Sequence, residues 1–218
     1  MEDSSPCWVQ NDRLYMIIVV DYDMGNLNSV SKALTKVGAK VEVCRDPEKI
    51  RQADKLVVPG VGAFGDCMKN LQNYGLLEPI REFIRSGKPY LGICLGMQIL
   101  MSYSLEFGKY EGLGIFEGEA IPFDKSPQLK VPHMGWNQLK IAEDTRLFQG
   151  IPNEAYVYFV HSFYVEPKNP NIIAATTDYG VNFTSALEWE NIFATQFHPE
   201  KSQNIGLKIL QNFCELSS

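Results

Sequence analysis

The sequence predicts an α/β fold: a doubly wound, mostly parallel sheet flanked by helices, with additional antiparallel strands. Over about the first half of the 218 residues, short β-branched runs alternate with segments of helical periodicity. After about residue 108, short apolar alternations separated by turn residues replace that pattern and favour antiparallel strands. No linker, repeat or low-complexity stretch interrupts the chain, so residues 16–218 are expected to form one domain.

Composition and charge argue against a secreted, membrane-spanning or nucleic-acid-binding protein. Residues 1–15 are polar and irregular, lack the apolar core of a signal peptide, and are expected to be an extension outside the folded core. No apolar run approaches the ~20 residues of a membrane span, and a net charge of −6 without a basic stripe argues against nucleic acid. Five scattered cysteines without C-x-x-C spacing indicate a reducing, cytoplasmic setting, and neither disulfides nor a metal site.

The alternating part of the chain predicts a strand at 17–21 that is buried on both faces. It also predicts an alternating strand at 40–44, a third strand at 55–59 and a fourth that ends near Cys94. Helices are expected between them. The first is capped by Asn26 or Asn28 and closed by Gly38, the second begins at Asp46-Pro47, and a third region breaks near Gly75 and resumes over 77–85. Apolar residues at 95, 99, 100, 103 and 105 predict a further helix after Cys94.

The remaining chain predicts short strands and one closing helix. Apolar alternation marks residues 120–123, 138–141, 156–165 and 172–176. Residues 185–189 and 192–197 are expected to form a hairpin that turns at 190–191. The closing helix is expected to begin at a Ser202 cap.

The stretch around Cys94 has the G-x-C-x-G pattern of a nucleophile elbow, with Gly92 and Gly96 on either side. A nucleophile on a sharp strand-to-helix turn leaves little room for Cβ atoms on its neighbours. The N-terminus of the following helix offers unpaired N–H groups that stabilise a thiolate and an oxyanion. The alternative is a buried structural cysteine on a parallel strand.

A second candidate is His198-Pro199-Glu200, at the end of an expected strand. The two side chains can project from one strand end into the same cleft. A neighbouring imidazole can take the proton of a free thiol, and a carboxylate on the far ring nitrogen fixes the tautomer. Alone, this H-x-E pattern also describes a strand-end histidine beside a surface glutamate; the Cys94 pattern favours a triad.

The third candidate is the glycine-rich loop at 59–65, after the third expected strand. It lacks the G-K-[ST] of a P-loop and does not follow the first strand, which argues against a nucleotide site. Loops at the carboxyl ends of adjacent parallel strands line one crevice, so this loop can place an N–H opposite that of Leu95. The alternative is a turn that needs glycine only for positive φ.

In order, these three stretches resemble the class I (triad) glutamine amidotransferases, from Met16 to the C-terminus. Within that family, three segments are similar to the glutaminase subunit of imidazole glycerol phosphate synthase. They are DYDMGNLNSV at 21–30, PGVGAFG at 59–65 and PHMGWN at 132–137, of which the last is the most specific.

The resemblance implies that glutamine is hydrolysed to glutamate and ammonia through a thioester on Cys94. His198 would act as base and then acid, and Glu200 would orient it. It implies no cofactor. Backbone groups of the glycine loop and elbow would form the oxyanion hole, and neighbouring residues would hold glutamine. The oxyanion hole would comprise Val61, Gly62 and Leu95, and the substrate site Gly62, Leu95, Gln98 and Ser162.

The resemblance also implies a partner. Ammonia would pass to a separate (β/α)₈ cyclase subunit that makes imidazole glycerol phosphate and an aminoimidazole carboxamide ribotide in histidine biosynthesis. A barrel of ~250 residues does not fit in this chain beside the glutaminase domain, so a heterodimer is expected. In this family the oxyanion hole is often completed only in the liganded complex. Candidate interface residues are Asn26, Asn28, His133, Trp136, Asn137 and Lys201.

Several alternatives stay open. Trp136 lies in a polar, turn-rich segment, where it is either an interface anchor or packed under a loop. His161 is expected mid-strand in a structural role, although that strand can line the glutamine pocket. The alternative enzymes are another class I amidotransferase and a γ-glutamyl-type cysteine hydrolase that acts alone. A non-catalytic subunit with a decayed triad is disfavoured by the intact Cys94, His198 and Glu200.

Overall fold

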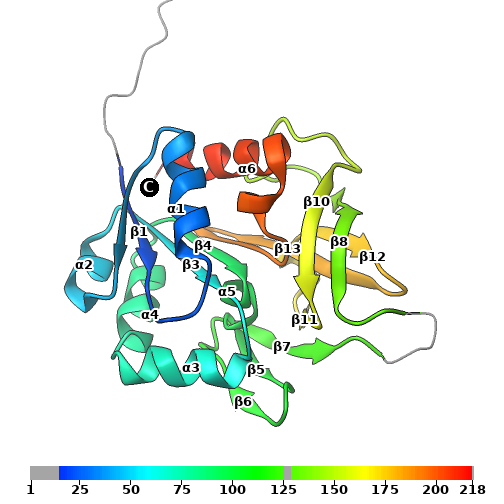
Figure 1. The fold of residues 1–218 in the computed structure, drawn as a ribbon, viewed down its shortest axis with the longest axis horizontal. Coiled ribbons are helices and arrows are strands. Elements are labelled where there is room, and N and C mark those ends of the chain that lie inside the picture. The colour runs from blue at the N-terminus through cyan, green and yellow to red at the C-terminus, as the bar shows by residue number, and fades with distance from the viewer. Residues whose placement is uncertain (1–14, 125–128, 218) are drawn as a thin grey trace, which may run out of the picture.

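The computed structural model describes residues 15–124 and 129–217; the expected extension, apart from Tyr15, lies outside the described residues. A mixed sheet with helices on both faces forms the body of the domain (Figure 1). Its parallel half has the strand order β2-β1-β3-β4-β14. These strands are β1 (Met16–Val20), β2 (Lys40–Cys44), β3 (Lys55–Gly60), β4 (Tyr90–Cys94) and β14 (Ile192–Thr195). The predicted fold class is confirmed.

Beyond β14 the sheet continues through β13, β11, β7, β5 and β6, with mostly antiparallel pairing. Strands β12 and β9 extend it from β13, and β8 and β10 form a separate two-stranded sheet. The bounds are β5 (Met101–Ser104), β6 (Tyr110–Glu111), β7 (Phe116–Pro122), β8 (His133–Gln138), β9 (Lys140–Ile141), β10 (Tyr156–His161), β11 (Phe163–Pro167), β12 (Ile173–Asp178) and β13 (Asn182–Trp189).

Two apolar cores lie on the two faces of the sheet. Along β1, Ile18 and Val20 join the core that contains residues of α2, α3 and α4. Ile17 and Val19 join the core that contains residues of α1 and α6. A strand buried on both faces needs a continuous apolar run, as the sequence of β1 provides. The helices are α1 (Leu27–Lys36), α2 (Pro47–Gln52), α3 (Phe64–Asn73), α4 (Leu77–Arg85) and α6 (Gln203–Glu215), with 3₁₀ turns η1 (Pro170–Ile172) and η2 (Pro199–Lys201).

Local signals placed the first helices correctly. The Asn26 side chain accepts a hydrogen bond from the Ser29 N–H at 3.2 Å and caps α1. Asp46 caps α2 in the same way, with Pro47 in the first turn. Within the described residues, no helix has the length and apolarity to cross a membrane.

The helix predicted after Cys94 is wrong beyond its first turn. Helix α5 covers only Leu95–Gln98, and Met101–Ser104 forms β5 instead. The carbonyls of Ile99 and Leu100 accept hydrogen bonds from the N–H groups of Leu113 and Ile115, at 2.7 and 3.0 Å. Because a distant segment pairs with these backbone groups, tertiary contacts override the local helical period.

Candidate active site

The strand order of the parallel half brings three predicted segments together. Gly60, at the end of β3, pairs with Cys94, at the end of β4. Thr195, at the end of β14, pairs with Ile93 on the other side of β4. The glycine loop, the cysteine and the segment that follows β14 therefore emerge side by side at the carboxyl edge of the sheet, where α/β folds place their ligands.

The turn at Cys94 has the strained geometry of a nucleophile elbow. Its backbone has φ +56° and ψ −106°, a conformation that L-residues rarely adopt. A Cβ on Gly92 would lie 2.3 Å from the carbonyl oxygen of Gly96, and one on Gly96 would lie 1.8 Å from that of Val58. Both glycines are therefore required by close backbone approach, as their positions predict.

The His198 ring is held in place by its side chain and its backbone. Its Nδ1 donates to Glu200 Oε1 at 2.9 Å, and both side chains are almost completely buried. The His198 N–H donates to the Tyr158 carbonyl, and the Ser202 hydroxyl donates to the His198 carbonyl at 2.7 Å. Ser202 precedes α6 as predicted, but its side chain secures His198 and does not cap the helix.

Electrostatics favour the protonated imidazole. Burial alone would lower the pKa of His198, but the neighbouring Cys94 and Glu200 raise it to about 10. The second ring nitrogen, Nε2, is buried and makes no hydrogen bond among the described residues. That nitrogen is therefore free to exchange a proton with the thiol of Cys94, while Glu200 stabilises the resulting imidazolium.

A cavity of about 450 Å³ opens in front of the sulfur, which is a suitable size for a small ligand. It brings together the predicted nucleophile, oxyanion and substrate residues. Gly62 has φ +105° there, in the region that favours glycine. A larger cavity of about 730 Å³ lies beside α3 and β6 and includes none of the predicted site residues. The predicted residues on the smaller cavity are Cys94, Val61, Gly62, Leu95, Gln98, Ser162 and Lys201.

Sequence reasoning missed Gln196. This fully buried side chain donates its Nε2 to the Cys94 sulfur at 3.5 Å and accepts from Gln98 Nε2 at 3.1 Å. The Gln98 donor fixes which end of the Gln196 amide faces the sulfur. Gln196 precedes His198 by two residues, so strand alternation could have drawn attention to it.

The predicted interface residues are divided between surface and interior. Asn26 and Asn28 are exposed at the start of α1, and Trp136 is 45% exposed on β8. Lys201 is exposed and also borders the cavity. Asn137 is half-buried and donates to the Asp178 carbonyl at 2.9 Å.

His133 does not lie at the surface; only 3% of it is exposed. Its ring is stacked on Phe159 and Tyr179, and its Nδ1 lies 3.0 Å from Nε2 of His161. Any effect of His133 on a partner therefore passes through its neighbours. His161 is buried as well and borders the cavity, but it is the last residue of β10 and does not lie mid-strand as expected.

A cysteine on a strand-to-helix elbow, beside a buried histidine–carboxylate pair, defines a cysteine-nucleophile hydrolase built on a mixed α/β sheet. The sequence matches the family "Glutamine amidotransferase class-I" over residues 18–216. The chain belongs to this family.

Within this family, the chain is similar to proteins that share one name. The chain is 52% identical to imidazole glycerol phosphate synthase subunit HisH of Syntrophotalea carbinolica, over 92% of this chain and all of that protein. It is 51% identical to the subunit of the same name from Geobacter sulfurreducens, over 92% of this chain and 98% of that protein.

Solved structures support the fold. A glutamine amidotransferase structure superposes with a TM-score of 0.71 at 18% identity, covering 91% of this chain and 99% of that one. PurLQS from Thermotoga maritima also gives a TM-score of 0.71, at 19% identity, over 91% and 97% of the two chains.

Proposed function

We propose that this chain is the glutaminase subunit of an imidazole glycerol phosphate synthase, hydrolysing glutamine and supplying ammonia for histidine biosynthesis. The observation that carries the proposal is the convergence of Cys94, His198 and Glu200 at one strand edge, with Cys94 lining a cavity of small-ligand size. The identities of 52% and 51% to HisH subunits select this reaction among those of the family.

The chemistry follows from the positions of these groups. Transfer of the Cys94 thiol proton to His198 Nε2 gives a thiolate beside an imidazolium, and the Cys94 sulfur then attacks the side-chain amide carbon of glutamine. The C–N bond then breaks, His198 returns that proton to the leaving amine, and ammonia departs from a glutamyl thioester. His198 next deprotonates a water molecule that hydrolyses the thioester, and glutamate and the free thiol are released.

Each tetrahedral intermediate carries a negative oxygen that needs preorganised donors. The N–H of Leu95, on the first residue of α5, supplies one donor. The second comes from the backbone of Val61 or Gly62, on the opposite rim of the cavity. Gln98 and Ser162 hold the glutamine in the same cavity.

The ammonia acceptor is a separate cyclase subunit of (β/α)₈ barrel form, which makes imidazole glycerol phosphate and the carboxamide ribotide. The two chains form a heterodimer in the cytoplasm. The carboxyl edge that carries the triad faces this partner, through Asn26, Asn28, Trp136, Asn137 and Lys201.

Glutamate release tests the proposal. The isolated chain and its mixture with the cognate cyclase subunit are assayed with glutamine, with and without the nucleotide ligand of the cyclase. We expect little release from the chain alone and strong release from the liganded mixture. Cys94→Ala should abolish that release, because removal of the nucleophile removes the covalent route.

Two results would contradict the proposal. Equal release by the isolated chain and the mixture would indicate a hydrolase that acts alone. Undiminished release by Cys94→Ala in the liganded mixture would remove the cysteine mechanism altogether.

A further inference from the structure

Beneath the glycine loop lies Tyr22, the second residue after β1 and a fully buried side chain. Its hydroxyl donates to the Pro59 carbonyl at 2.6 Å. Pro59 is the next-to-last residue of β3, and the candidate oxyanion residues Val61 and Gly62 follow directly. The hydroxyl therefore holds the last peptide of the strand from which the loop departs.

The same hydroxyl occupies the space beside Gly60. A Cβ on Gly60 would lie 2.2 Å from the Tyr22 oxygen and 2.9 Å from Cβ of Leu95. The phenol, the end of β3 and the first residue of α5 are thus in contact at one point. The two backbone segments that carry the oxyanion donors meet at Gly60, with the tyrosine hydroxyl against one of them.

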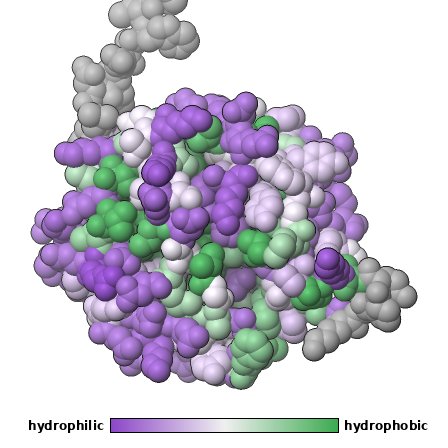
Figure 2. All heavy atoms as spheres, viewed as in Figure 1, coloured by the Kyte–Doolittle hydropathy of each residue, from purple (hydrophilic) through white to green (hydrophobic). Residues whose placement is uncertain are grey.

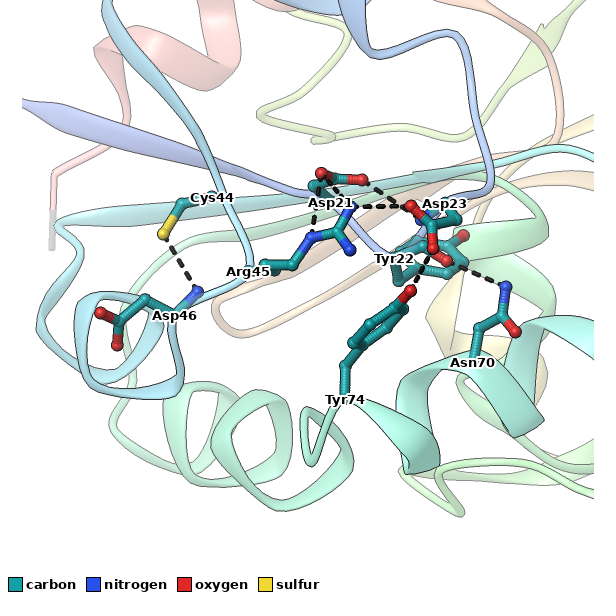
Figure 3. A network of polar contacts seen from close by, with 8 residues as sticks. All are labelled: Asp21, Tyr22, Asp23, Cys44, Arg45, Asp46, Asn70 and Tyr74. Carbon is teal, nitrogen blue, oxygen red and sulfur yellow. Dashed lines mark hydrogen bonds and ion pairs between the residues drawn. The ribbon is translucent and has the colours of Figure 1, made fainter.

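The backbone of Tyr22 is itself held from the outside, as Figure 3 shows. Asn70, on α3, donates its amide to the Tyr22 carbonyl at 3.1 Å. Arg45 bridges the flanking Asp21 and Asp23 at 2.6 and 2.7 Å, and the Tyr74 hydroxyl donates to Asp23. An exposed ion pair alone is weak, but here one cation joins the residues on both sides of the tyrosine.

The elbow at Cys94 is held by a comparable hydrogen bond from a buried tyrosine. Tyr90, also fully buried, donates its hydroxyl to the Gly96 carbonyl at 3.0 Å within the first turn after Cys94. Each of the two donor segments therefore receives one hydrogen bond from a tyrosine in the core below it. Both carbonyls are buried, so a lost bond leaves an acceptor without a partner.

We propose that Tyr22 is a positioning residue for the oxyanion hole, holding the Pro59–Gly60 peptide so that the following N–H groups point at the developing negative oxygen. This inference rests on the proposed glutaminase function. It assigns to the tyrosine an effect on the transition state, where the negative charge develops, and not on glutamine binding.

The test is Tyr22→Phe in the liganded complex with the cyclase. We expect kcat for glutamate release to fall about tenfold, the cost of roughly 1.4 kcal/mol of transition-state stabilisation, with KM for glutamine within about twofold. The rate of Cys94 alkylation by iodoacetamide should stay unchanged, because displacement at the reagent's carbon develops no oxyanion. A merely structural defect would lower both rates.

Two further variants serve as a control and as a second test. Tyr179→Phe removes the same type of bond, since the Tyr179 hydroxyl donates to the Lys130 carbonyl at 2.7 Å, and it should leave kcat and KM unchanged. Arg45→Met removes the outer anchor at a half-exposed position and should lower kcat in the same direction by about two- to fivefold, again with KM retained. Arg45→Met keeps the proposal testable if Tyr22→Phe does not fold.

The inference is overturned if Tyr22→Phe keeps the wild-type kcat, or if alkylation of Cys94 slows as much as turnover does. If Tyr22→Phe does not fold, a wild-type kcat in Arg45→Met overturns it instead. The proposed function fails separately, through absence of glutamate release from the wild-type complex.

Discussion

At the scale of single residues, the candidate site depends on the local environments of Cys94, His198 and Glu200. Cys94 occupies a backbone conformation that flanking glycines make possible, and His198 is fixed by Glu200 on one ring nitrogen. The carboxylate helps to raise the pKa of His198 to about 10, against the opposing effect of burial. We therefore expect the charge of Glu200, and not only its hydrogen bond, to contribute to catalysis.

Glu200→Gln tests this statement. The amide oxygen can still accept from Nδ1, but the imidazolium loses its counter-charge and its pKa falls. We expect kcat in the liganded complex to fall by roughly 10²-fold or more, yet less than in Cys94→Ala, as orienting carboxylates behave in other triads. Steady-state glutamate release measures it. A kcat equal to wild type would mean that Glu200 is a bystander.

At the scale of elements, periodicity and caps predicted most of what forms. The parallel strands, the Asn26 and Asp46 caps and the hairpin turning at 190–191 follow from local signals. Helix α5 stops after one turn because the backbone of Ile99 and Leu100 pairs with a segment about fifteen residues away. Local period carries no information about such a pairing.

In the site, too, some features follow from local sequence signals and others depend on contacts between distant segments. The meeting of the glycine loop with Cys94 was predicted, because both follow parallel strands that end at one edge. His198 was assigned to the same site from its motif, since its strand was expected only in an antiparallel hairpin, and the parallel pairing of β14 with β4 is a finding of the structure. Burial of His133 and the contact of Gln196 with the Cys94 sulfur depend on neighbours brought from distant strands. The burial of His133 could not be read from the residues that flank it, and alternation with His198 could indicate the side on which Gln196 lies but not its contact with the sulfur.

The sheet formed by β8 and β10 contains a second histidine arrangement. Nδ1 of His161 donates to the Phe163 carbonyl at 2.8 Å, so its Nε2 accepts from Nδ1 of His133, whose Nε2 accepts from Asn137. Both rings are therefore neutral. Burial lowers the pKa of His161 to about 3 and that of His133 to about 4.

We expect this pair to make the fold sensitive to acid. Between about pH 6.5 and pH 4 the unfolded chain protonates both histidines while the folded chain does not, so the free energy of unfolding falls as pH falls. The slope is up to about 1.4 kcal/mol per pH unit for each histidine. Urea unfolding of the wild type and of His161→Gln at pH 6.5 and 5 should show a smaller slope in the variant.

His198 provides the matched control. Its folded pKa is raised to about 10, so between pH 5 and 6.5 it is protonated in the folded chain and largely protonated in the unfolded chain. The stability that it contributes is fully present below about pH 6.5 and is lost as pH rises toward 10. His198→Gln should therefore keep most of the wild-type acid slope, and an unchanged slope in His161→Gln would contradict the account of the pair.

At the scale of the whole molecule, exposed apolar side chains lie on the glycine loop and on β8, a strand of the separate two-stranded sheet. Val61, Met134 and Trp136 are 42%, 62% and 45% exposed. Figure 2 shows apolar residues breaking the largely hydrophilic surface across the middle of the face that it presents. Exposed aromatic residues of this kind are typical anchors of protein interfaces.

Trp136→Ala tests whether this exposed surface binds the cyclase subunit. Removal of an interface anchor should weaken cyclase binding by about 2 kcal/mol, roughly 30-fold in Kd. Trp189, which is 41% exposed and pairs with Ile192 at the amino end of β14, offers a matched control on the opposite edge of the parallel strands. Titration calorimetry should find Kd unchanged in Trp189→Ala. Equal affinity in the two variants would remove Trp136 from the interface.

The central claim is that Cys94 is a glutamine-directed nucleophile, and covalent labelling tests it most directly. The liganded complex is treated with a chloroketone analogue of glutamine, with and without excess glutamine, and the adduct is mapped by peptide mass spectrometry. We predict one adduct, on Cys94, that glutamine suppresses and that forms faster with the cyclase present. An adduct on Cys44, Cys67 or Cys214 in place of Cys94, or labelling that glutamine does not suppress, would contradict the account.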